Sequence, residues 1–410
     1  NAGSRTEIRQ GENFGGVILD GGDLVFAGDF RSNINFTAER NAGLDLRSGS
    51  ITTEFTNVAT GGVLNRTGST IAVEKTTTGT VVLGPGVSIG GAIPVNLHEG
   101  TLALSVAALQ AAHTGEYLIG DIGPATLRLD GPGQGTRAAY TLIGSSGGTF
   151  DVSDAGGTLT FTGEFEAQGG FTKAGPGTLV LTRANALQGT TVTGGVLRVA
   201  DPAALGSGPV SVTGGTLQVA TGVVLQGQGV TVDGGSLSAG SLTVGGSGLT
   251  TVAVTRGGIT GSPVIDVAAG GSLTLPAATR TVVTATSLTV DEAGSVLDLG
   301  SSAIQFAAGG IDAAALRADI LAGRGNGSWN GTAGITSATA AATSGRAVAY
   351  VINGDGSGQV GYAAVGDVDL SGAVNVFDLV SINSAGKYGS GSASVWSQGD
   401  FNYDGVTNVF

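Results

Sequence analysis

The sequence lacks cysteine and methionine altogether, and charged side chains make up only 12% of its 410 residues. Without cysteine, neither disulfides nor thiolate-bound metals can hold the fold together. The formal net charge is -13, from 18 basic and 31 acidic residues. Because an acidic, lysine-poor surface repels phosphate backbones and anionic lipid headgroups, we expect no nucleic-acid partner.

Long apolar runs are missing as well. No stretch reaches the roughly 18 to 20 residues that a membrane-spanning helix needs, so we expect no membrane insertion in this segment. The chain starts at Asn1 without an export signal and without methionine. We interpret it as processed or as part of a longer protein, and the avoidance of cysteine fits an exported bacterial chain.

The feature that is present is one short phrase repeated at nearly fixed intervals. Each copy is a turn followed by alternating residues. The five clearest copies are Gly156-Gly-Thr-Leu-Thr-Phe, Pro176-Gly-Thr-Leu-Val-Leu, Gly194-Gly-Val-Leu-Arg-Val, Gly214-Gly-Thr-Leu-Gln-Val and Gly234-Gly-Ser-Leu-Ser-Ala. Their starts are 20, 18, 20 and 20 residues apart. One copy is too small to bury its own apolar face, so the copies must stack, which predicts a mainly β fold, a β-solenoid.

Alternation assigns the two faces of each predicted strand. Leu217 and Val219 lie two residues apart and share one face, whereas Gln218 points to the other. The residues expected to stack into an internal ladder are Leu179, Leu197, Leu217 and Leu237. Looser copies extend the pattern, and we interpret residues 1–305 as one elongated solenoid.

Residues 306–365 are expected to cover the end of the solenoid, because an open end exposes unpaired strand edges. Asp312 can cap a helix over residues 313–322 that Gly323 ends. A hairpin is predicted from residues 346–352 and 359–365. Earlier in the chain, a short helix is expected to begin at Ser105.

The strongest chemical signal lies near the carboxyl end, in a predicted calcium loop. Its positions 1, 3, 5, 7, 9 and 12 are Asp367, Asp369, Ser371, Ala373, Asn375 and Asp378. Alternate residues turn their oxygens inward, position 7 offers its backbone carbonyl, and position 12 adds a carboxylate. Gly372 at position 6 permits the sharp turn.

A second copy follows 33 residues later. Its positions 1, 3, 5, 7 and 9 are Asp400, Asn402, Asp404, Val406 and Asn408. Two loops in matching register predict Ca²⁺ as the bound ion. Position 12 of the second loop would follow Phe410, so we expect the parent sequence to continue.

Two family resemblances follow from these motifs. The tandem loops and the short helix expected over residues 377–383 resemble a dockerin, as found at the ends of large bacterial surface proteins. Lys173-Ala-Gly-Pro-Gly-Thr-Leu-Val-Leu-Thr and Gly189-Thr-Thr-Val-Thr-Gly-Gly-Val-Leu-Arg-Val resemble the autotransporter-associated β-strand repeat. The resemblance implies a secreted, right-handed parallel β-helix with a truncated, dockerin-like calcium-binding tail over residues 366–410.

The sequence therefore favours a non-enzymatic, structural or adhesive protein located outside the cell or on its surface. We expect a rod or fibre subunit that self-associates head to tail through its solenoid ends, with calcium ordering the carboxyl-terminal module. A glycan or a cohesin-like protein is a further expected partner. The alternative is a secreted β-helix polysaccharide lyase or hydrolase that uses the tail for assembly. His98 and His113 have no nearby carboxylate pattern in the sequence, which favours a surface or packing role for both.

Overall fold

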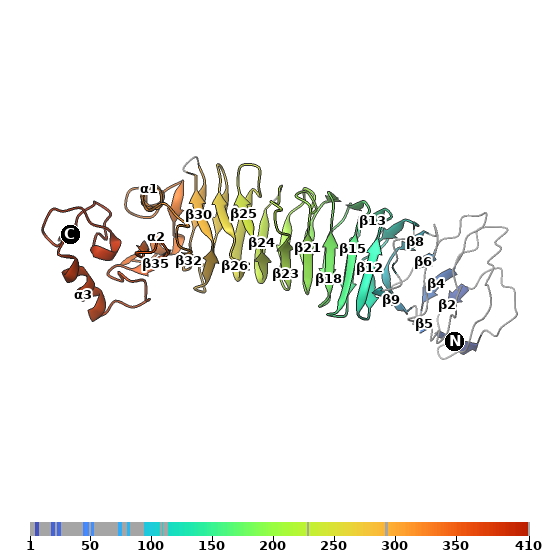
Figure 1. The fold of residues 1–410 in the computed structure, drawn as a ribbon. Helices are drawn as coiled ribbons and strands as arrows, with labels where there is room; N and C mark the ends of the chain where they lie inside the picture. The colour runs from blue at the N-terminus through green and yellow to red at the C-terminus, as the bar shows by residue number, and fades with distance from the viewer. Residues whose placement is uncertain are drawn as a thin grey trace. The chain divides into compact units, whose positions relative to one another are not determined.

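The computed structural model describes residues 94–408, except 107–108, 110–113, 228 and 292–293, together with the backbone of seven short strands before residue 94. Contacts divide the chain into two compact units, Asn1–Gln218 and Val219–Phe410. Strands dominate the described part of each unit (Figure 1). Asn1 and Phe410, the first and last residues of the chain, lie outside the described residues.

The first unit is a β-solenoid in which four successive turns, from β10 to β21, contribute three strands each. The strands form three parallel ladders, in which each strand pairs with its counterpart on the next turn. The first ladder contains β2 (Ile18–Asp20), β4 (Leu44–Ser48), β6 (Val73–Lys75), β8 (Val95–Leu97), β10 (Tyr117–Ile119), β13 (Thr141–Ile143), β16 (Phe165–Ala167) and β19 (Ala186–Leu187). The second contains β5 (Ile51–Thr52), β7 (Thr80–Val82), β9 (Gly100–Ser105), β11 (Ala125–Asp130), β14 (Gly148–Val152), β17 (Phe171–Ala174), β20 (Thr190–Val192) and β22 (Val210–Val212). The third contains β12 (Gly133–Arg137), β15 (Gly157–Phe161), β18 (Thr178–Leu181), β21 (Val196–Val199) and β23 (Thr216–Val219), while β1 (Arg5–Glu7) pairs separately with β3 (Asp23–Val25).

The repeated phrase forms the third ladder. Leu159 pairs with Leu179, and Leu179 with Leu197, so identical side chains stack from turn to turn. Leu217 and Val219 are buried and Gln218 is exposed, which confirms the predicted faces of that strand. Leu237 is buried too. Alternation within each strand is therefore what fills the solenoid interior.

Four phenylalanines fill one part of this interior. Phe150, Phe161, Phe165 and Phe171 come from all three ladders, and neighbouring ring centroids lie 4.9 to 5.9 Å apart. Most of these pairs meet edge to face, the arrangement that the ring quadrupole favours. All four rings are almost completely buried, so this cluster joins the three ladders into one core.

The second unit also contains parallel ladders. One contains β24 (Val230–Ser238), β26 (Thr251–Thr260), β28 (Ser272–Thr274), β31 (Val296–Asp298) and β33 (Gly334–Thr336). Another contains β25 (Ser241–Val244), β27 (Val264–Val267) and β30 (Ser287–Val290). A mixed sheet contains β29 (Val282–Ala285), β32 (Ala303–Phe306), β35 (Gly358–Ala364) and β34 (Arg346–Ile352). The helices are α1 (Ala313–Arg324), α2 (Ala338–Ala341), α3 (Val376–Ala385) and the short 3-10 helix η2 (Trp396–Gln398).

The predicted hairpin is confirmed and lies at the end of a ladder. Strands β34 and β35 pair antiparallel, and β35 also pairs antiparallel with β32. The direction of pairing therefore changes at β32, where the parallel stacking of this sheet ends. In this way the hairpin covers the strand edge that β32 would otherwise expose.

Helix α1 is also confirmed, but its end is not where the sequence places it. Asp312 caps it by accepting hydrogen bonds from the Ala314 and Ala315 N–H groups. The helix continues through Gly323 to Arg324, and Gly325 is its cap. A side-chain carbon at Gly323 would collide with the Ile335 carbonyl oxygen of β33. Gly323 thus allows close packing of helix and strand rather than ending the helix.

Other local expectations differ from the structure. Ser105 is the last residue of β9 rather than a helix cap, and most of the segment up to His113 lies outside the described residues. The stretch between α1 and the hairpin holds β33 and α2, which the sequence pattern missed. Because β33 pairs with β31, the predicted cap region takes part in the solenoid ladder. The division of the chain at residues 305 and 365 stays a prediction.

Candidate metal centre

The two predicted calcium loops share one backbone conformation. Leu370 and Tyr403, each at position 4 of its loop, both have positive φ angles, of 58° and 61°. Gly372 and Gly405, each at position 6, have φ angles of 95° and 91°. A positive φ is uncommon for leucine or tyrosine, so its recurrence at one loop position shows that the loops are built alike.

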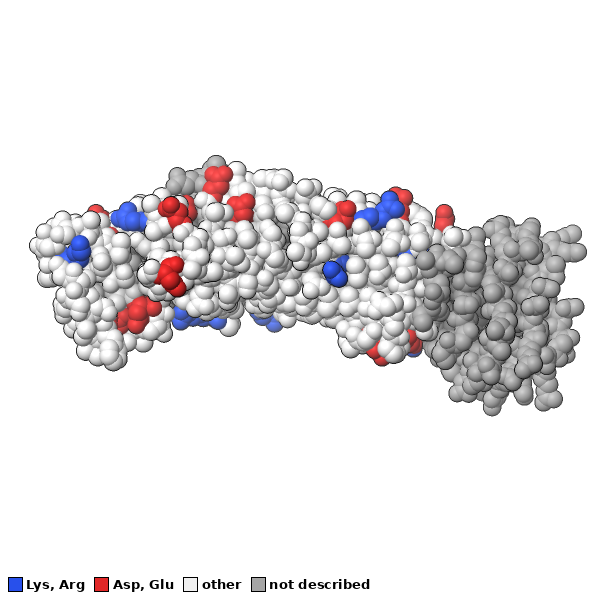
Figure 2. All heavy atoms as spheres, in the orientation of Figure 1, with Lys and Arg blue, Asp and Glu red and all other residues white. Residues whose placement is uncertain are grey.

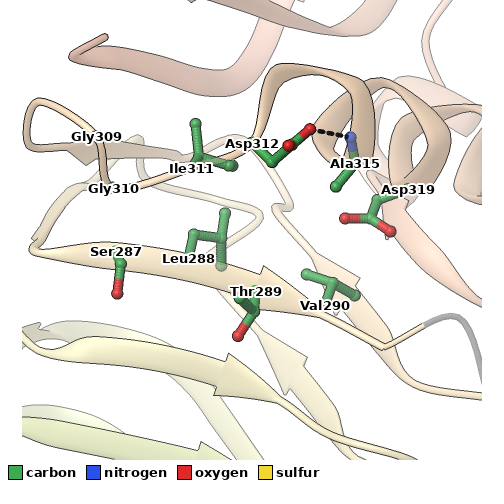
Figure 3. Close-up of a pocket in the computed structure, with 10 residues that line it drawn as sticks. All are labelled: Ser287, Leu288, Thr289, Val290, Gly309, Gly310, Ile311, Asp312, Ala315 and Asp319. Atoms are coloured by element: carbon green, nitrogen blue, oxygen red, sulfur yellow. Dashed lines mark hydrogen bonds between the residues drawn. The ribbon is translucent and has the colours of Figure 1, made fainter.

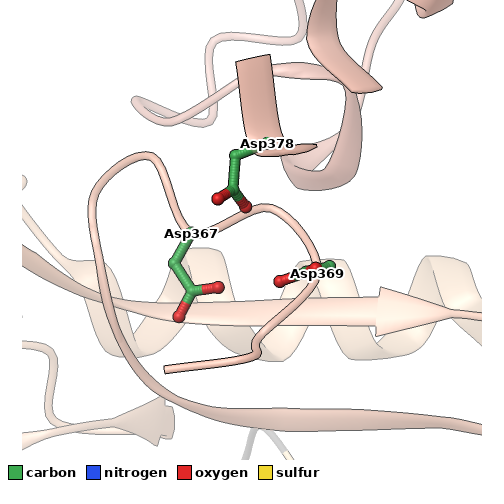
Figure 4. Close-up of side chains that lie close together, drawn as sticks. All are labelled: Asp367, Asp369 and Asp378. Carbon is green, nitrogen blue, oxygen red and sulfur yellow. The ribbon is translucent and has the colours of Figure 1, made fainter. Parts of the chain in front are cut away.

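In the first loop, three carboxyl groups converge. One oxygen from each of Asp367, Asp369 and Asp378 lies within 4.8 Å of the other two (Figure 4). Asp367 and Asp378 are buried, at 1% and 2% exposure. Asp367 Oδ2 accepts a hydrogen bond of 2.9 Å from the Gly372 N–H, whereas Asp367 Oδ1 is buried without a hydrogen-bond partner. Desolvation of a carboxylate without a compensating partner is costly, and a cation would remove that cost.

Asp378 explains why α3 begins where it does. Its Oδ2 accepts from the Asn375 N–H at 2.7 Å, and Asn375 Oδ1 accepts from the Phe377 N–H at 2.8 Å, which forms a capping box. Asp378 Oδ1 accepts from the Val368 N–H at 2.9 Å, which ties the loop's first turn to the helix. Each carboxylate oxygen retains a second lone pair for a metal ion.

The remaining positions of the first loop bring further oxygens close together. Asp369 Oδ1 accepts from the Ser371 N–H at 2.9 Å. The Ser371 hydroxyl and the Asn375 amide both lie 3.3 Å from the Ala373 carbonyl oxygen, to which each donates. All six predicted first-loop residues thus belong to one connected arrangement. It is rich in the oxygen ligands that Ca²⁺ prefers.

The electrostatics separate the buried carboxyl group from the exposed one. Burial raises the pKa of Asp367, and the neighbouring Asp369 and Asp378 add to that rise. Hydrogen bonds from Ser371 lower the pKa of Asp369. The neighbouring carboxylates therefore repel one another around Asp367, and a bound cation would relieve that repulsion.

In the second loop, the aspartate at position 1 makes the same contact as Asp367 does in the first. Asp400 is 1% exposed, its Oδ2 accepts from the Gly405 N–H at 3.0 Å, and its Oδ1 is buried without a hydrogen-bond partner. Asn402 Oδ1 accepts from the Asp404 N–H at 3.0 Å. Asp404 in turn accepts from the Val406 N–H and from the Asn408 amide. Burial raises the pKa of Asp400, as it does for Asp367.

Arg317 on α1 distinguishes the two loops. Its Nη2 donates to the Tyr403 carbonyl oxygen at 2.9 Å and lies 3.7 Å from Asp400 Oδ2. The guanidinium thus meets the carboxylate oxygen that Gly405 already binds, and not the unpartnered Oδ1. It offsets part of the negative charge of the second loop and holds that loop against α1.

Two aromatic residues that sequence reasoning missed fix both loops in place. The Trp396 indole N–H donates to the Asp367 carbonyl oxygen at 2.9 Å, and the Tyr403 hydroxyl donates to the Val348 carbonyl oxygen of β34 at 2.8 Å. Their ring centroids lie 5.8 Å apart. The one signal in the sequence that could have indicated Trp396 and Tyr403 is their position, as rare aromatic residues, between and within the loops.

Other chemistry-bearing groups form no comparable site among the described residues. His98 Nδ1 lies 2.8 Å from Asp121 Oδ1. The two residues lie on neighbouring turns, and the sequence pattern did not predict their contact. A groove of about 320 Å³ lies between β30 and α1 (Figure 3). Asp312 there caps the helix, Asp319 is engaged in an interaction of its own, and no basic side chain lines the groove.

The outer surface carries few charges. On the face that Figure 2 shows, charged side chains of the described residues stand singly or in small groups among uncharged ones. Among the helices of the described residues, none has the length and apolar character to span a bilayer.

Comparison with known proteins identifies the repeat. Residues 171–199 match the family described as Passenger-associated-transport-repeat. The match begins at the first residue of β17 and ends at the last residue of β21. It does not include the two predicted calcium loops, so the dockerin resemblance stays a prediction.

A curated protein is also similar to part of the chain. The adhesin BmaC autotransporter of Brucella suis biovar 1 (strain 1330) is 39% identical over 87 residues. That stretch covers 21% of this chain and 2% of the adhesin, so the chain spans a very small share of that relative. No solved structure matches the chain significantly.

Proposed function

We propose that this chain is part of a non-enzymatic, adhesive or structural protein of the bacterial surface or the extracellular space. The observation that carries this function is the coincidence of the matched passenger repeat with complete solenoid strands, β17 to β21. The similarity to an adhesin supports the adhesive role. A parallel solenoid repeats its outward residues once per turn, and such regular arrays suit binding to extended targets.

An adhesion assay tests this function. Beads coated with the chain are passed over immobilised fibronectin, collagen and mixed glycans, and their retention is compared with that of albumin-coated beads. We expect retention well above the albumin level on at least one surface. Equal retention on every surface would count against adhesion, and release of unsaturated products from polygalacturonate would instead favour the lyase alternative.

We also propose that the two loops bind Ca²⁺. The first loop would use Asp367, Asp369, Asp378 and the oxygens of Ser371, Ala373 and Asn375. The second would use Asp400, Asn402, Asp404, Asn408 and the Val406 carbonyl. The buried, unpartnered Oδ1 atoms of Asp367 and Asp400 support the fit, because each occupies position 1 of its loop. When bound, the ion would neutralise clustered carboxylates and fix the loops.

Calcium binding is tested by isothermal titration of the metal-free chain. Ca²⁺ is expected to bind and to raise the melting temperature of the carboxyl-terminal segment, because a ligand of the folded state stabilises it. Mg²⁺ serves as the comparison, since it demands a smaller octahedral site. Absence of a calcium-dependent heat and of any shift in melting would overturn the assignment.

Self-association and a cohesin-like partner are further proposals. Helix α1 packs on β33 and the hairpin pairs with β32, so the carboxyl end of the ladders offers a second copy little free strand edge. Helix α3 leaves large apolar side chains exposed, with Phe377 at 71%, which supports binding of a protein. Light scattering over a concentration series tests self-association, and a mass that stays monomeric at all concentrations would contradict it.

A further inference from the structure

A second concavity of the carboxyl-terminal unit has the features of a ligand site. It measures about 240 Å³ and lies where the end of α1, the start of β34 and the second calcium loop meet. Its lining includes Arg324, Trp329, Arg346, Val365, Phe401 and Asn402. We propose that this pocket binds a single sugar unit that carries a carboxylate.

Two arginines give the pocket its positive charge. Among the described residues, neither guanidinium has a hydrogen bond or a salt bridge, although the Arg346 guanidinium carbon lies 5.5 Å from the Tyr362 ring centroid. Two such groups in one cavity are notable in a chain with only 18 basic residues and a net charge of -13. Guanidinium groups bind carboxylates through paired hydrogen bonds, so an anion is the complementary ligand.

One carboxylate outside the pocket, that of Asp404, acts on Arg324 from a distance. The Val406 N–H is the main cause that lowers the pKa of Asp404, and Arg324 contributes to the lowering. No oxygen of Asp404 lies within salt-bridge distance of Arg324 in the described structure. The Arg324 guanidinium therefore keeps its donors available for a ligand.

Trp329 is held in a strained conformation at the same place. Its φ angle is +57°, a value that bulky residues rarely adopt. The buried Thr336 hydroxyl donates to its carbonyl oxygen at 2.9 Å, and its ring meets the Tyr403 ring at a centroid distance of 6.2 Å. Strained residues that the surroundings hold in place are concentrated at ligand sites, so this observation supports the pocket independently of its charge.

The other lining residues define the chemical class of the ligand. Phe401 is partly exposed and is supported by Trp396 at a ring distance of 5.0 Å, so with Val365 it offers an apolar wall. The Asn402 amide nitrogen donates one hydrogen to Asp404 Oδ2 at 2.9 Å, which leaves its second hydrogen for a hydroxyl group. An apolar wall with a few converging polar groups fits a ring with hydroxyls and one charge. The volume lies below the about 300 to 1,000 Å³ of sites for drug-sized ligands, which suits one sugar unit.

The pocket shares a residue with the second calcium loop. Asn402 occupies position 3 of that loop and also lines the pocket. Calcium that fixes the loop would therefore fix one wall of the pocket. The acidic-sugar site deepens the adhesive function proposed above and rests on it.

Titration of the whole 410-residue chain with D-glucuronate, D-glucose and acetate tests the pocket, with binding followed by calorimetry at saturating Ca²⁺. Glucuronate is expected to bind more tightly than either glucose or acetate. Arg346→Gln and Arg324→Gln should each weaken glucuronate binding by about tenfold, because each removes a charge-assisted contact. Phe401→Leu should weaken glucuronate binding and leave acetate binding unchanged.

The exposed Arg198 of the first unit provides the matched control. Arg198→Gln removes the same charge outside the pocket and should leave glucuronate binding unchanged. Melting temperatures establish that the variants fold. Because Arg346 is exposed, its replacement is the one least expected to disturb folding. Equal binding of acetate and glucuronate, or equal weakening by Arg198→Gln and Arg346→Gln, would overturn the site. Bead retention separates the proposals: if it persists without glucuronate binding, the pocket assignment alone fails.

Discussion

The ammonium group of Lys173 donates a hydrogen bond of 3.1 Å to the carbonyl oxygen of Gly194, which lies on the following turn of the solenoid. The same nitrogen donates to the carbonyl oxygens of Ala174 and Gly175, at 2.6 and 2.9 Å. The lysine side chain is completely buried. One buried cation therefore satisfies three carbonyl groups and links successive glycine turns within the matched repeat.

Replacement of this lysine by methionine is expected to destabilise the first unit. Lys173→Met keeps the length of the side chain but leaves three carbonyl groups without their donor. Loss of a buried donor costs about 1–3 kcal/mol of unfolding free energy. Urea unfolding at neutral pH measures the change, with Lys387→Met at a more exposed site as control. Equal midpoints for Lys173→Met and the unmodified chain would contradict the role of the lysine.

The stability of the same unit should also depend on alkaline pH. Burial lowers the pKa of Lys173 to about 8, whereas an unfolded lysine titrates near 10.4. Between these values the unfolded chain binds the proton that the folded chain has released. The contribution of Lys173 to the unfolding free energy therefore rises with pH, by at most about 1.4 kcal/mol per pH unit. The difference between the unmodified chain and Lys173→Met, measured from pH 8 to 10, isolates this contribution; a difference that is constant with pH would contradict it.

The ladder and the loops could be predicted because their signals are local and repeated. Alternation at every second residue placed Leu179 and Leu197 in the core, and fixed spacing brought their strands into register. The loop positions likewise placed Asp367, Asp369 and Asp378 together. In both cases the information lies in short stretches of sequence, where backbone geometry alone determines which side chains share a face.

Contacts between distant segments could not be predicted in this way. Arg317 and Tyr403 are 86 residues apart, and no periodic pattern connects them. Gly323 resembles a helix terminator in the sequence, yet its role depends on β33, a strand too short to be recognised before the fold is known. Tertiary packing determines both features. Local helix propensity gives no information about the first and suggests the wrong role for the second.

Gly323 provides a prediction with a sign opposite to that of helix propensity. Alanine within a helix usually stabilises a protein by about 0.5–1 kcal/mol relative to glycine. Gly323→Ala is instead expected to lower the melting temperature, because its methyl group would collide with the Ile335 carbonyl oxygen. Gly354→Ala, in the open hairpin turn, is the control and should change stability little. A rise in melting temperature for Gly323→Ala would show that helix and strand separate without cost.

The two loops are expected to bind calcium with unequal affinity. The first has three converging carboxylates, whereas the second has Asp400 and Asp404 with Arg317 close to Asp400. Calcium affinity increases with the negative charge of the ligands, so the first loop should bind more tightly. Asp367→Asn should remove the tighter event in a calorimetric titration, and Asp400→Asn the weaker one. Asp355→Asn in the hairpin is the acidic control, and loss of the tighter event in Asp400→Asn would reverse the assignment.

The attachment of the second loop to the hairpin should depend on one hydroxyl group. Tyr403→Phe removes the donor to the Val348 carbonyl oxygen and keeps the aromatic packing with Trp396 and Tyr350. The expected loss is about 1 kcal/mol of unfolding free energy. Hydrogen exchange should increase in β34 and in the second loop together, while the strands of the first unit remain as protected as before. Tyr388→Phe, at an exposed position, is the control; unchanged exchange in β34 of Tyr403→Phe would mean that ring packing alone holds the loop in place.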